Sequence, residues 1–347
     1  MKKSLIALAA VAATGAAFAQ SSVTLFGVVD TAVTYVDGQN NWSGMTSGGN
    51  SSSRLGFRGV EDLGNGLKAQ FWLEGAIATD DGSGEGGGAP GPGFEFKRRS
   101  TVSLLGNFGE VRLGRSTTAA YDATSRYDVF GTVGVGQSKQ FGDIIRISNM
   151  VGYYSPDFSG FKFGANYGFG EQAGENRANR YMGLSATYDN GPLSVGFGYD
   201  SLDRATNLLA DLDRVSVGAS YNFGMLKLLG AYTQVDRKFL GAAPKKKDHD
   251  YYLGVSAPVG AAGEVKVAYN HYEEKTSGAA KKKADQFSLG YVHSLSKRTA
   301  VYGTYAYLKN KNGSALTLGG LPVSSGTAND NGLGKQQAIQ VGVRHSF

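Results

Sequence analysis

The last eleven residues of the chain alternate between apolar and polar side chains. From Gln337 to Phe347, the apolar residues that share one face are Ile339, Val341, Val343 and Phe347. The polar residues on the opposite face are Gln340, Arg344 and Ser346. A period of two residues is that of a β-strand with one apolar side, whereas a helix would scatter these positions around its surface. About ten residues also suffice for a tilted strand to cross a bilayer.

Segments of the same kind recur along the whole chain and give sixteen predicted strands. They are Val23–Val36, Ser53–Glu61, Leu67–Thr79, Phe96–Leu105, Val111–Ser116, Asn149–Ser155, Phe161–Phe169, Tyr181–Asp189, Leu193–Ser201, Asp213–Phe223, Met225–Asp236, Tyr251–Pro258, Glu264–Tyr272, Asp285–Ser294, Arg298–Lys309 and Gln336–Phe347. The fold class that this pattern predicts is all-β, with antiparallel neighbours joined by hairpins.

The connections between these segments are alternately short and long. The short ones have hairpin residues and are Leu63–Gly66, Asn107–Gly109, Asp157–Gly160, Asn190–Gly191, Gly224 and Ser296–Lys297. The long ones are polar and are Asp80–Gly93, Thr117–Ile147, Gly170–Asn179, Leu202–Leu212, Arg237–Asp250, Glu273–Ala284 and Asn310–Lys335. Short turns at one end and long loops at the other are typical of an outer-membrane β-barrel. An even number of strands places both termini at the short-turn, periplasmic end.

The composition is compatible with such a barrel but does not select it. The chain has 52 Gly, 19 Tyr, 18 Phe and no Cys, so neither disulfides nor thiolate metal sites hold it together. Beyond residue 19, no apolar run approaches the roughly 20 residues that a transmembrane helix needs. A secreted β-solenoid or lectin-like sandwich could have a similar composition, so the argument for a barrel depends on the strand and loop pattern.

The N-terminus has the features of a secretory signal peptide. Lys2 and Lys3 precede the apolar run Leu5–Val11, and Ala17–Ala19 is a small-x-small cleavage site. The apolar run is too short for a membrane anchor. We therefore predict that residues 1–19 are removed and that residues 20–347 form one barrel in the outer membrane.

Four segments resemble the general porins of Gram-negative bacteria, the β-proteobacterial branch in particular. Gln20–Asp30 (QSSVTLFGVVD) is similar to their mature N-terminus, and Ser53–Gly64 (SRLGFRGVEDLG) to their second strand and first periplasmic turn. Gly109–Arg115 (GEVRLGR) resembles the strand that leads into their constriction loop, and Val341–Phe347 (VGVRHSF) resembles their closing strand. Together these matches extend over the whole mature chain.

The resemblance implies a homotrimer of 16-stranded antiparallel transmembrane β-barrels. In each barrel the third long loop folds inward and narrows the bore. The corresponding segment here is Thr117–Ile147, and it departs from the Pro-Glu-Phe-Gly-Gly motif of enteric relatives. The acidic side of the constriction is therefore the part of the family pattern that this sequence matches least.

The resemblance also implies a pore constriction lined by arginines of the barrel wall. Arg54, Arg98 and Arg146 match these wall arginines, and Arg99 competes with Arg98 for its assignment. Strand alternation adds Arg58, which shares a face with Arg54. Because an arginine in contact with lipid would cost a few kcal/mol, we expect both to face water. The alternative is that they only solvate the lumen away from its narrowest point.

Opposite the wall arginines, the resemblance implies an acidic patch on the inward loop. Asp122 and Asp128 are the candidates, although loop carboxylates are often simply solvated. The terminal Phe347 matches the C-terminal aromatic residue that the barrel-assembly machinery reads in this family. Its alternative interpretation is an aromatic side chain at the membrane interface.

We thus expect a passive diffusion porin for small hydrophilic solutes and ions, mildly anion-selective because of its arginines. A substrate-specific porin for a sugar or organic anion, and an adhesin or structural barrel, are the alternatives. The expected partners are the other two subunits, periplasmic chaperones, the assembly machinery and outer-membrane lipid. The lysine runs Lys245–Lys247 and Lys281–Lys283, interpreted as loop surface, could also contact lipopolysaccharide phosphates.

Other classes of function have little support in the sequence. The basic residues are not gathered on one element with aromatic platforms, so nucleic acid is not expected as a partner. The four histidines His249, His271, His293 and His345 lack metal-ligand spacing, and no Gly-x-Ser-x-Gly motif occurs. Gly131–Gly136 lacks the spacing of a nucleotide-binding loop. We expect no catalytic residue, cofactor or metal.

Overall fold

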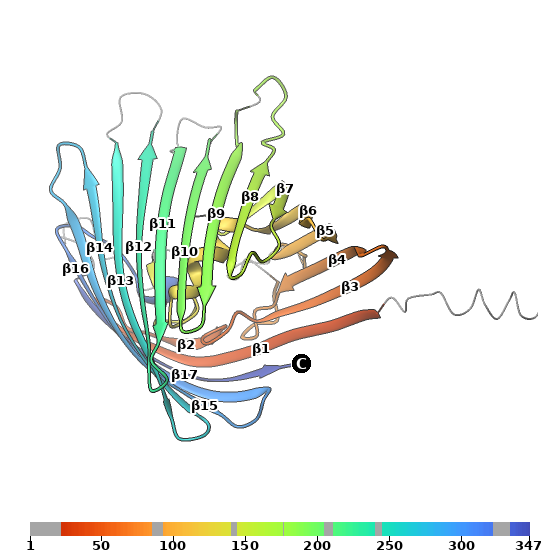
Figure 1. Cartoon of the computed structure of the whole chain (residues 1–347). Helices are drawn as coiled ribbons and strands as arrows, with labels where there is room; N and C mark the ends of the chain where they lie inside the picture. The colour runs from red at the N-terminus through yellow and green to blue at the C-terminus, as the bar shows by residue number, and fades with distance from the viewer. Residues whose placement is uncertain are drawn as a thin grey trace, which may run out of the picture.

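The structure is a computed structural model that describes residues 22–84, 93–139, 144–175, 177–204, 211–239, 245–321 and 334–347. The predicted signal peptide, residues 1–19, lies outside these ranges. Within the described residues, no helix is long and apolar enough to cross a membrane. The described chain consists mainly of strands that form one continuous antiparallel sheet closed on itself (Figure 1).

The sheet closes because the first strand, β1, pairs with the last, β17. The strands are β1 (Ser22–Asp37), β2 (Trp42–Ser47), β3 (Arg54–Gly64), β4 (Leu67–Ala76), β5 (Arg99–Gly106), β6 (Gly109–Thr117), β7 (Arg146–Tyr154), β8 (Phe161–Gly168), β9 (Tyr181–Asn190), β10 (Leu193–Leu202), β11 (Asp211–Asn222), β12 (Lys227–Lys238), β13 (Lys246–Val259), β14 (Gly263–Thr276), β15 (Lys282–Ser294), β16 (Thr299–Lys311) and β17 (Lys335–Ser346). Each consecutive pair from β3 to β17 is antiparallel. The predicted all-β barrel is confirmed.

The barrel has sixteen wall positions although seventeen strands are present, because β2 and β3 share one position. Residues Thr31–Val36 of β1 pair with β2, and residues Ser22–Val28 of the same strand pair with β3. Residues 48–53 leave the wall between β2 and β3. β2 was not predicted from the sequence, since WSGMTS is too short and too rich in small residues to stand out as a strand.

The two faces of the wall follow the alternation of the sequence. On β17, Ile339 and Val341 are 53% and 58% exposed on the outside, whereas Gln340, between them, is only 2% exposed. Large apolar side chains cover the outside of the other strands in the same way, including Leu25, Val217 and Leu253. The outside therefore presents the apolar surface that lipid requires, and the polar side chains face the lumen.

Several strands extend beyond the predicted limits at the long-loop end. β13 and β15 begin at Lys246 and Lys282, so most of both lysine runs lie in strands and not in loops as predicted. Cross-strand ion pairs with the neighbouring strands accompany the extension, for example Lys247–Asp236 at 3.2 Å and Lys283–Glu273 at 2.8 Å. Opposite charges on adjacent strands stabilise the strand pairing here. The sequence pattern did not indicate these parts of the strands because they contain few apolar residues.

Candidate functional site

The third loop runs inside the barrel, as the resemblance implies. It leaves β6 at Thr118, whose side chain caps the short helix α2 (Ala119–Thr124) by accepting a hydrogen bond from the Tyr121 N–H at 3.1 Å. A 3₁₀ turn, η1 (Ser125–Tyr127), follows. In Figure 1 this segment is the gold ribbon within the ring of strands. The loop therefore lies across the lumen, at a height where the strands of the wall surround it.

The loop lies directly against glycines on the lumen face of β10 and β11. A Cβ atom added to Gly196 would lie 2.4 Å from the Ala123 carbonyl oxygen, and one added to Gly218 would lie 2.2 Å from Tyr127 Cδ2. Any larger residue would therefore overlap the loop. Tyr127 also hydrogen-bonds Ser194 at 3.0 Å, which fixes the loop laterally on this wall.

Asp128 holds the inward loop together from within. Its carboxylate accepts hydrogen bonds from the backbone N–H groups of Ser138 at 2.8 Å, Phe130 at 2.9 Å and Thr132 at 3.2 Å. The Tyr252 hydroxyl of β13 donates a fourth at 3.0 Å. The residue is only 4% exposed, and burial raises the pKa of its carboxyl. The structure thus places this predicted constriction residue within the loop and away from the lumen surface.

Asp122, the other acidic candidate, is exposed on α2. It accepts a hydrogen bond from Thr117 Oγ1 at 3.0 Å. Desolvation by the surrounding protein raises the pKa of its carboxyl, and the charges of Arg112, Arg99 and Arg146 act in the opposite direction. Asp122 and Arg112 line one cleft with Glu110 and Tyr154. This carboxylate is therefore the one that faces the basic wall.

Part of the basic wall is organised by Glu74 of β4. Arg98 Nε lies 2.7 Å from Glu74 Oε1, and Arg54 Nε lies 3.8 Å from the same atom. Arg54 also donates to the Ser52 carbonyl at 2.8 Å. Arg146, the first residue of β7, donates from Nε to the Arg98 carbonyl at 3.0 Å. The three arginines that match the family pattern are thus held side by side.

A second carboxylate, Glu110 of β6, holds Arg112, which was not predicted, and Arg99, which was predicted only as the alternative to Arg98. Arg112 donates to both Glu110 oxygens, at 2.8 and 3.0 Å, and its guanidinium lies 4.1 Å from the centre of the Tyr154 ring. Arg99 Nη2 lies 3.8 Å from Glu110, and its guanidinium lies 4.4 Å from the Trp72 ring centre. Alternation places Arg112 and Glu110 on one face, and this signal could have identified them.

Arg58 differs from the other wall arginines. Its guanidinium lies 5.3 Å from the centre of the Phe26 ring and 5.2 Å from that of Trp72. Within the part of the chain that the structure describes, no carboxylate forms an ion pair with it. Arg58 is exposed to the lumen and lies four residues beyond Arg54 toward the short β3–β4 turn, which is the periplasmic side.

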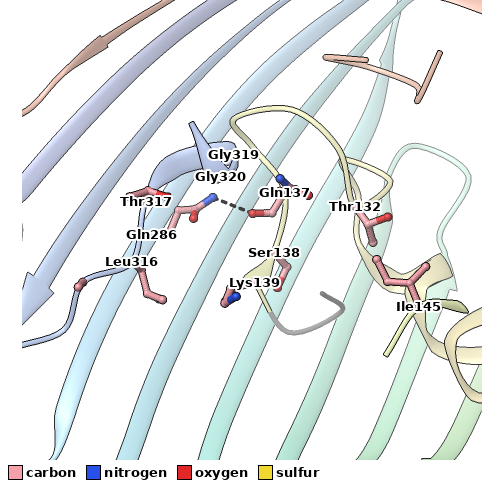
Figure 2. A pocket seen from close by; sticks show the side chains of 11 residues that line it. Thr132, Gln137, Ser138, Lys139, Ile145, Gln286, Leu316, Thr317, Gly319 and Gly320 are labelled. Carbon is pink, nitrogen blue, oxygen red and sulfur yellow. Dashed lines mark hydrogen bonds between the residues drawn. The ribbon is translucent and has the colours of Figure 1, made fainter. Parts of the chain in front are cut away.

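The described beginning of the last long loop, residues 312–321, also lies inside the barrel, which was not predicted from the sequence. Leu318 of the 3₁₀ turn η3 (Leu318–Gly320) is fully buried and packs with Val135 of the third loop. Figure 2 shows the cleft between the two loops, where Gln286 of β15 donates to the Gln137 carbonyl at 3.0 Å. The lumen is thus narrowed by two loops on the long-loop side.

The geometry agrees with comparisons to known proteins. The sequence profile that describes Gram-negative porins matches residues 5–313. The chain belongs to this porin family. The porin is 48% identical to outer membrane porin protein 32 of Delftia acidovorans, with both chains covered completely. It is 33% identical to an outer membrane porin of Bordetella pertussis, with 89% of this chain and 95% of the relative covered.

Solved structures show the same architecture. An anion-selective porin from Comamonas acidovorans superposes with a TM-score of 0.82 at 44% identity, over 94% of this porin and 100% of that chain. The outer membrane protein OmpT of Vibrio cholerae in its trimer form has a TM-score of 0.71 at 17% identity, over 94% and 99% of the two chains, and supports the fold alone. The predicted family, the sixteen-stranded fold and the outer-membrane location are confirmed. Family and fold are those of a diffusion channel.

Proposed function

We propose that the arginine wall gives this porin its preference for small anions. The observation that carries the proposal is the charge balance of the lumen wall at and below the constriction. Within the described residues, six guanidiniums lie on this wall, those of Arg54, Arg58, Arg98, Arg99, Arg112 and Arg146. Four of them pair with two wall carboxylates: Arg54 and Arg98 with Glu74, and Arg99 and Arg112 with Glu110. The relative from Comamonas acidovorans, an anion-selective porin, supports the same preference.

The selectivity follows from electrostatics and needs no chemical step. Low-dielectric walls concentrate the field of the fixed guanidiniums in the bore, which raises the local anion concentration. Asp122 on the opposing loop keeps the preference mild, because its negative charge lowers the potential and directs the field across the pore. Glu74 and Glu110 hold the guanidiniums in place, so the field is fixed before a solute arrives.

The proposal predicts that removal of Arg58 shifts ion selectivity toward cations. In a planar bilayer with a KCl gradient, the wild type should give a reversal potential of the anion-selective sign. Arg58→Gln should move it toward zero, because a wall guanidinium that forms no ion pair with a carboxylate in the described structure is lost. Lys309→Gln is the matched control, since it removes the same charge from the outward face of β16. A cation-selective wild type, or equal reversal potentials in both variants, would contradict the proposal.

We propose that the porin assembles as a homotrimer after cleavage before Gln20. OmpT of Vibrio cholerae, which shares the fold, has been solved in a trimer form.

We also propose that outward-facing lysines near the long-loop ends contact lipopolysaccharide phosphates. Lys247 of β13 and Lys283 of β15 support this proposal, since their side chains lie on the outer face of the barrel and are 46% and 36% exposed.

We propose that the barrel-assembly machinery recognises Phe347. The same residue also contributes to the seam, where β1 pairs with the last residues of the chain. Its N–H donates to the Gly27 carbonyl and its carbonyl accepts from the Gly27 N–H, both at 3.1 Å. Its ring covers Gly27, where a Cβ atom would lie 2.4 Å from Phe347 Cζ. The residue is therefore both an exposed C-terminal aromatic group and a structural contact.

Deletion of Phe347 should lower the yield of folded porin more in cells than in machinery-free refolding into liposomes. The contribution of the seam to stability is limited, because the two backbone hydrogen bonds are worth about 0.5–1.5 kcal/mol each. Folded and unfolded forms can be separated by their mobility in unheated gels. Phe347→Tyr should behave as wild type in both settings. An equal loss of folded porin in cells and in liposomes would contradict recognition by the assembly machinery, and Phe347 would then have only its structural role at the seam.

A further inference from the structure

We infer that Arg58, Phe26 and Trp72 form a second anion site in the lumen, which prefers aromatic carboxylates over aliphatic carboxylates of the same size. The inference builds on the proposed anion preference and adds a class of solute to it. Arg58 supplies an exposed guanidinium with no carboxylate partner in the described structure, and two rings lie within 5.3 Å of it.

The rings are held in position before any solute arrives. Trp72 Nε1 donates to Glu74 Oε2 at 3.1 Å, so the indole is tied to the carboxylate that also binds Arg98. Phe26 meets Trp72 edge to face, with ring centres 5.2 Å apart. On the other side, the Arg99 guanidinium lies 4.4 Å from the Trp72 ring centre. A fixed site loses less entropy on binding than a mobile one.

The arrangement fixes where a bound solute must lie. A carboxylate pairs with the edge of a guanidinium, where its N–H groups point. Because Phe26 and Trp72 flank Arg58 and are only partly buried, the remainder of the solute is brought beside these rings. A flat aromatic group gains ring–ring contact there, which a puckered aliphatic ring of equal size cannot match.

The site lies apart from the narrowest part of the pore. Arg58 is opposite Thr24, near the beginning of β1, whereas Arg54 is opposite Val28 and next to the inward segment 48–53. A solute that has passed the third loop from outside therefore meets this site next, on the periplasmic side. The site would retain aromatic anions briefly after the constriction has admitted them.

The test compares two monoanions, benzoate and cyclohexanecarboxylate, as blockers of the chloride current through single wild-type channels. We expect the half-blocking concentration of benzoate to be lower by a factor of about three or more, the size of an aromatic pair contribution. Trp72→Leu should abolish the difference. Arg58→Lys should reduce it, because lysine keeps the charge but lacks the planar guanidinium.

Trp42→Leu is the matched control, since it removes the only other tryptophan, which pairs opposite Val36 at the far end of β1. It should retain the benzoate preference. Equal block by both anions in the wild type would overturn the inference, as would a preference that survives in Trp72→Leu. The proposed anion selectivity is tested separately by the KCl reversal potential, so either idea can fail without the other.

Discussion

Gly218→Leu is expected to lower the single-channel conductance sharply without preventing the barrel from forming. The new side chain would occupy the space of the Tyr127 ring, since even a Cβ atom there would lie 2.2 Å from Tyr127 Cδ2. Overpacking of this kind costs about 1–3 kcal/mol when the neighbours stay in place. The third loop can relieve the strain by moving away from β11 toward the arginine wall, which narrows the bore. Single-channel recording in a planar bilayer measures the effect.

The matched control is Gly303→Leu on the outward face of β16. A Cβ atom at this position meets nothing within 4 Å, so the variant adds the same side chain on the lipid side. It should retain the wild-type conductance. A Gly218→Leu channel with wild-type conductance and selectivity would show that the loop does not depend on contact with this wall.

Replacing the two loop aspartates by alanine one at a time should give opposite kinds of defect. Asp128→Ala leaves three backbone N–H groups and the Tyr252 hydroxyl without their acceptor. Each buried polar group left without a partner costs about 1–3 kcal/mol, so the loop should loosen. We expect a noisy open-channel current and faster proteolysis within the loop.

Asp122→Ala should leave the loop in place and make the pore more anion-selective. In the described part of the chain its carboxylate accepts one side-chain hydrogen bond, from the Thr117 hydroxyl, while it faces the guanidiniums of the wall. Reversal potentials in a KCl gradient should therefore move further in the anion-selective direction. A quiet Asp128→Ala channel with altered selectivity would mean that the two aspartates exchange roles.

The wall of the barrel could be predicted from the sequence because its two faces are chemically different. The alternation of Ile339, Gln340 and Val341 identifies a strand by itself. β2 was missed because the side chains on its two faces differ little in polarity. Its pairing with β1 also requires residues 48–53 to leave the wall and turn into the lumen. The inward course of the last loop was hidden for a related reason. Leu318 lies in a short, glycine-containing segment of a long loop, and it becomes a core residue only when this segment packs against Val135 of the third loop and the barrel wall.

The site could be predicted only in part, since its members meet across strands. Face alternation correctly indicates that Arg54 and Arg58 point into the lumen, and it applies equally to Arg112. The pairing of Arg98 with Glu74, or of Arg99 with Trp72, depends on the register between β4 and β5. For Asp128, sequence spacing gives no information, because three of its four donors become available only once the loop has curled around it.

The seam between β1 and β17 has a consequence for biogenesis. Residues Val28–Asp37 pair with Gln337–Ser346, so the ring is completed by its first strand and its last. Until then, both strands present free N–H and C=O groups that can pair with any other chain. A chain that stops short of its final strand would carry two such open edges and should aggregate. This protein can therefore fold without aggregating only once its last strand has been synthesised.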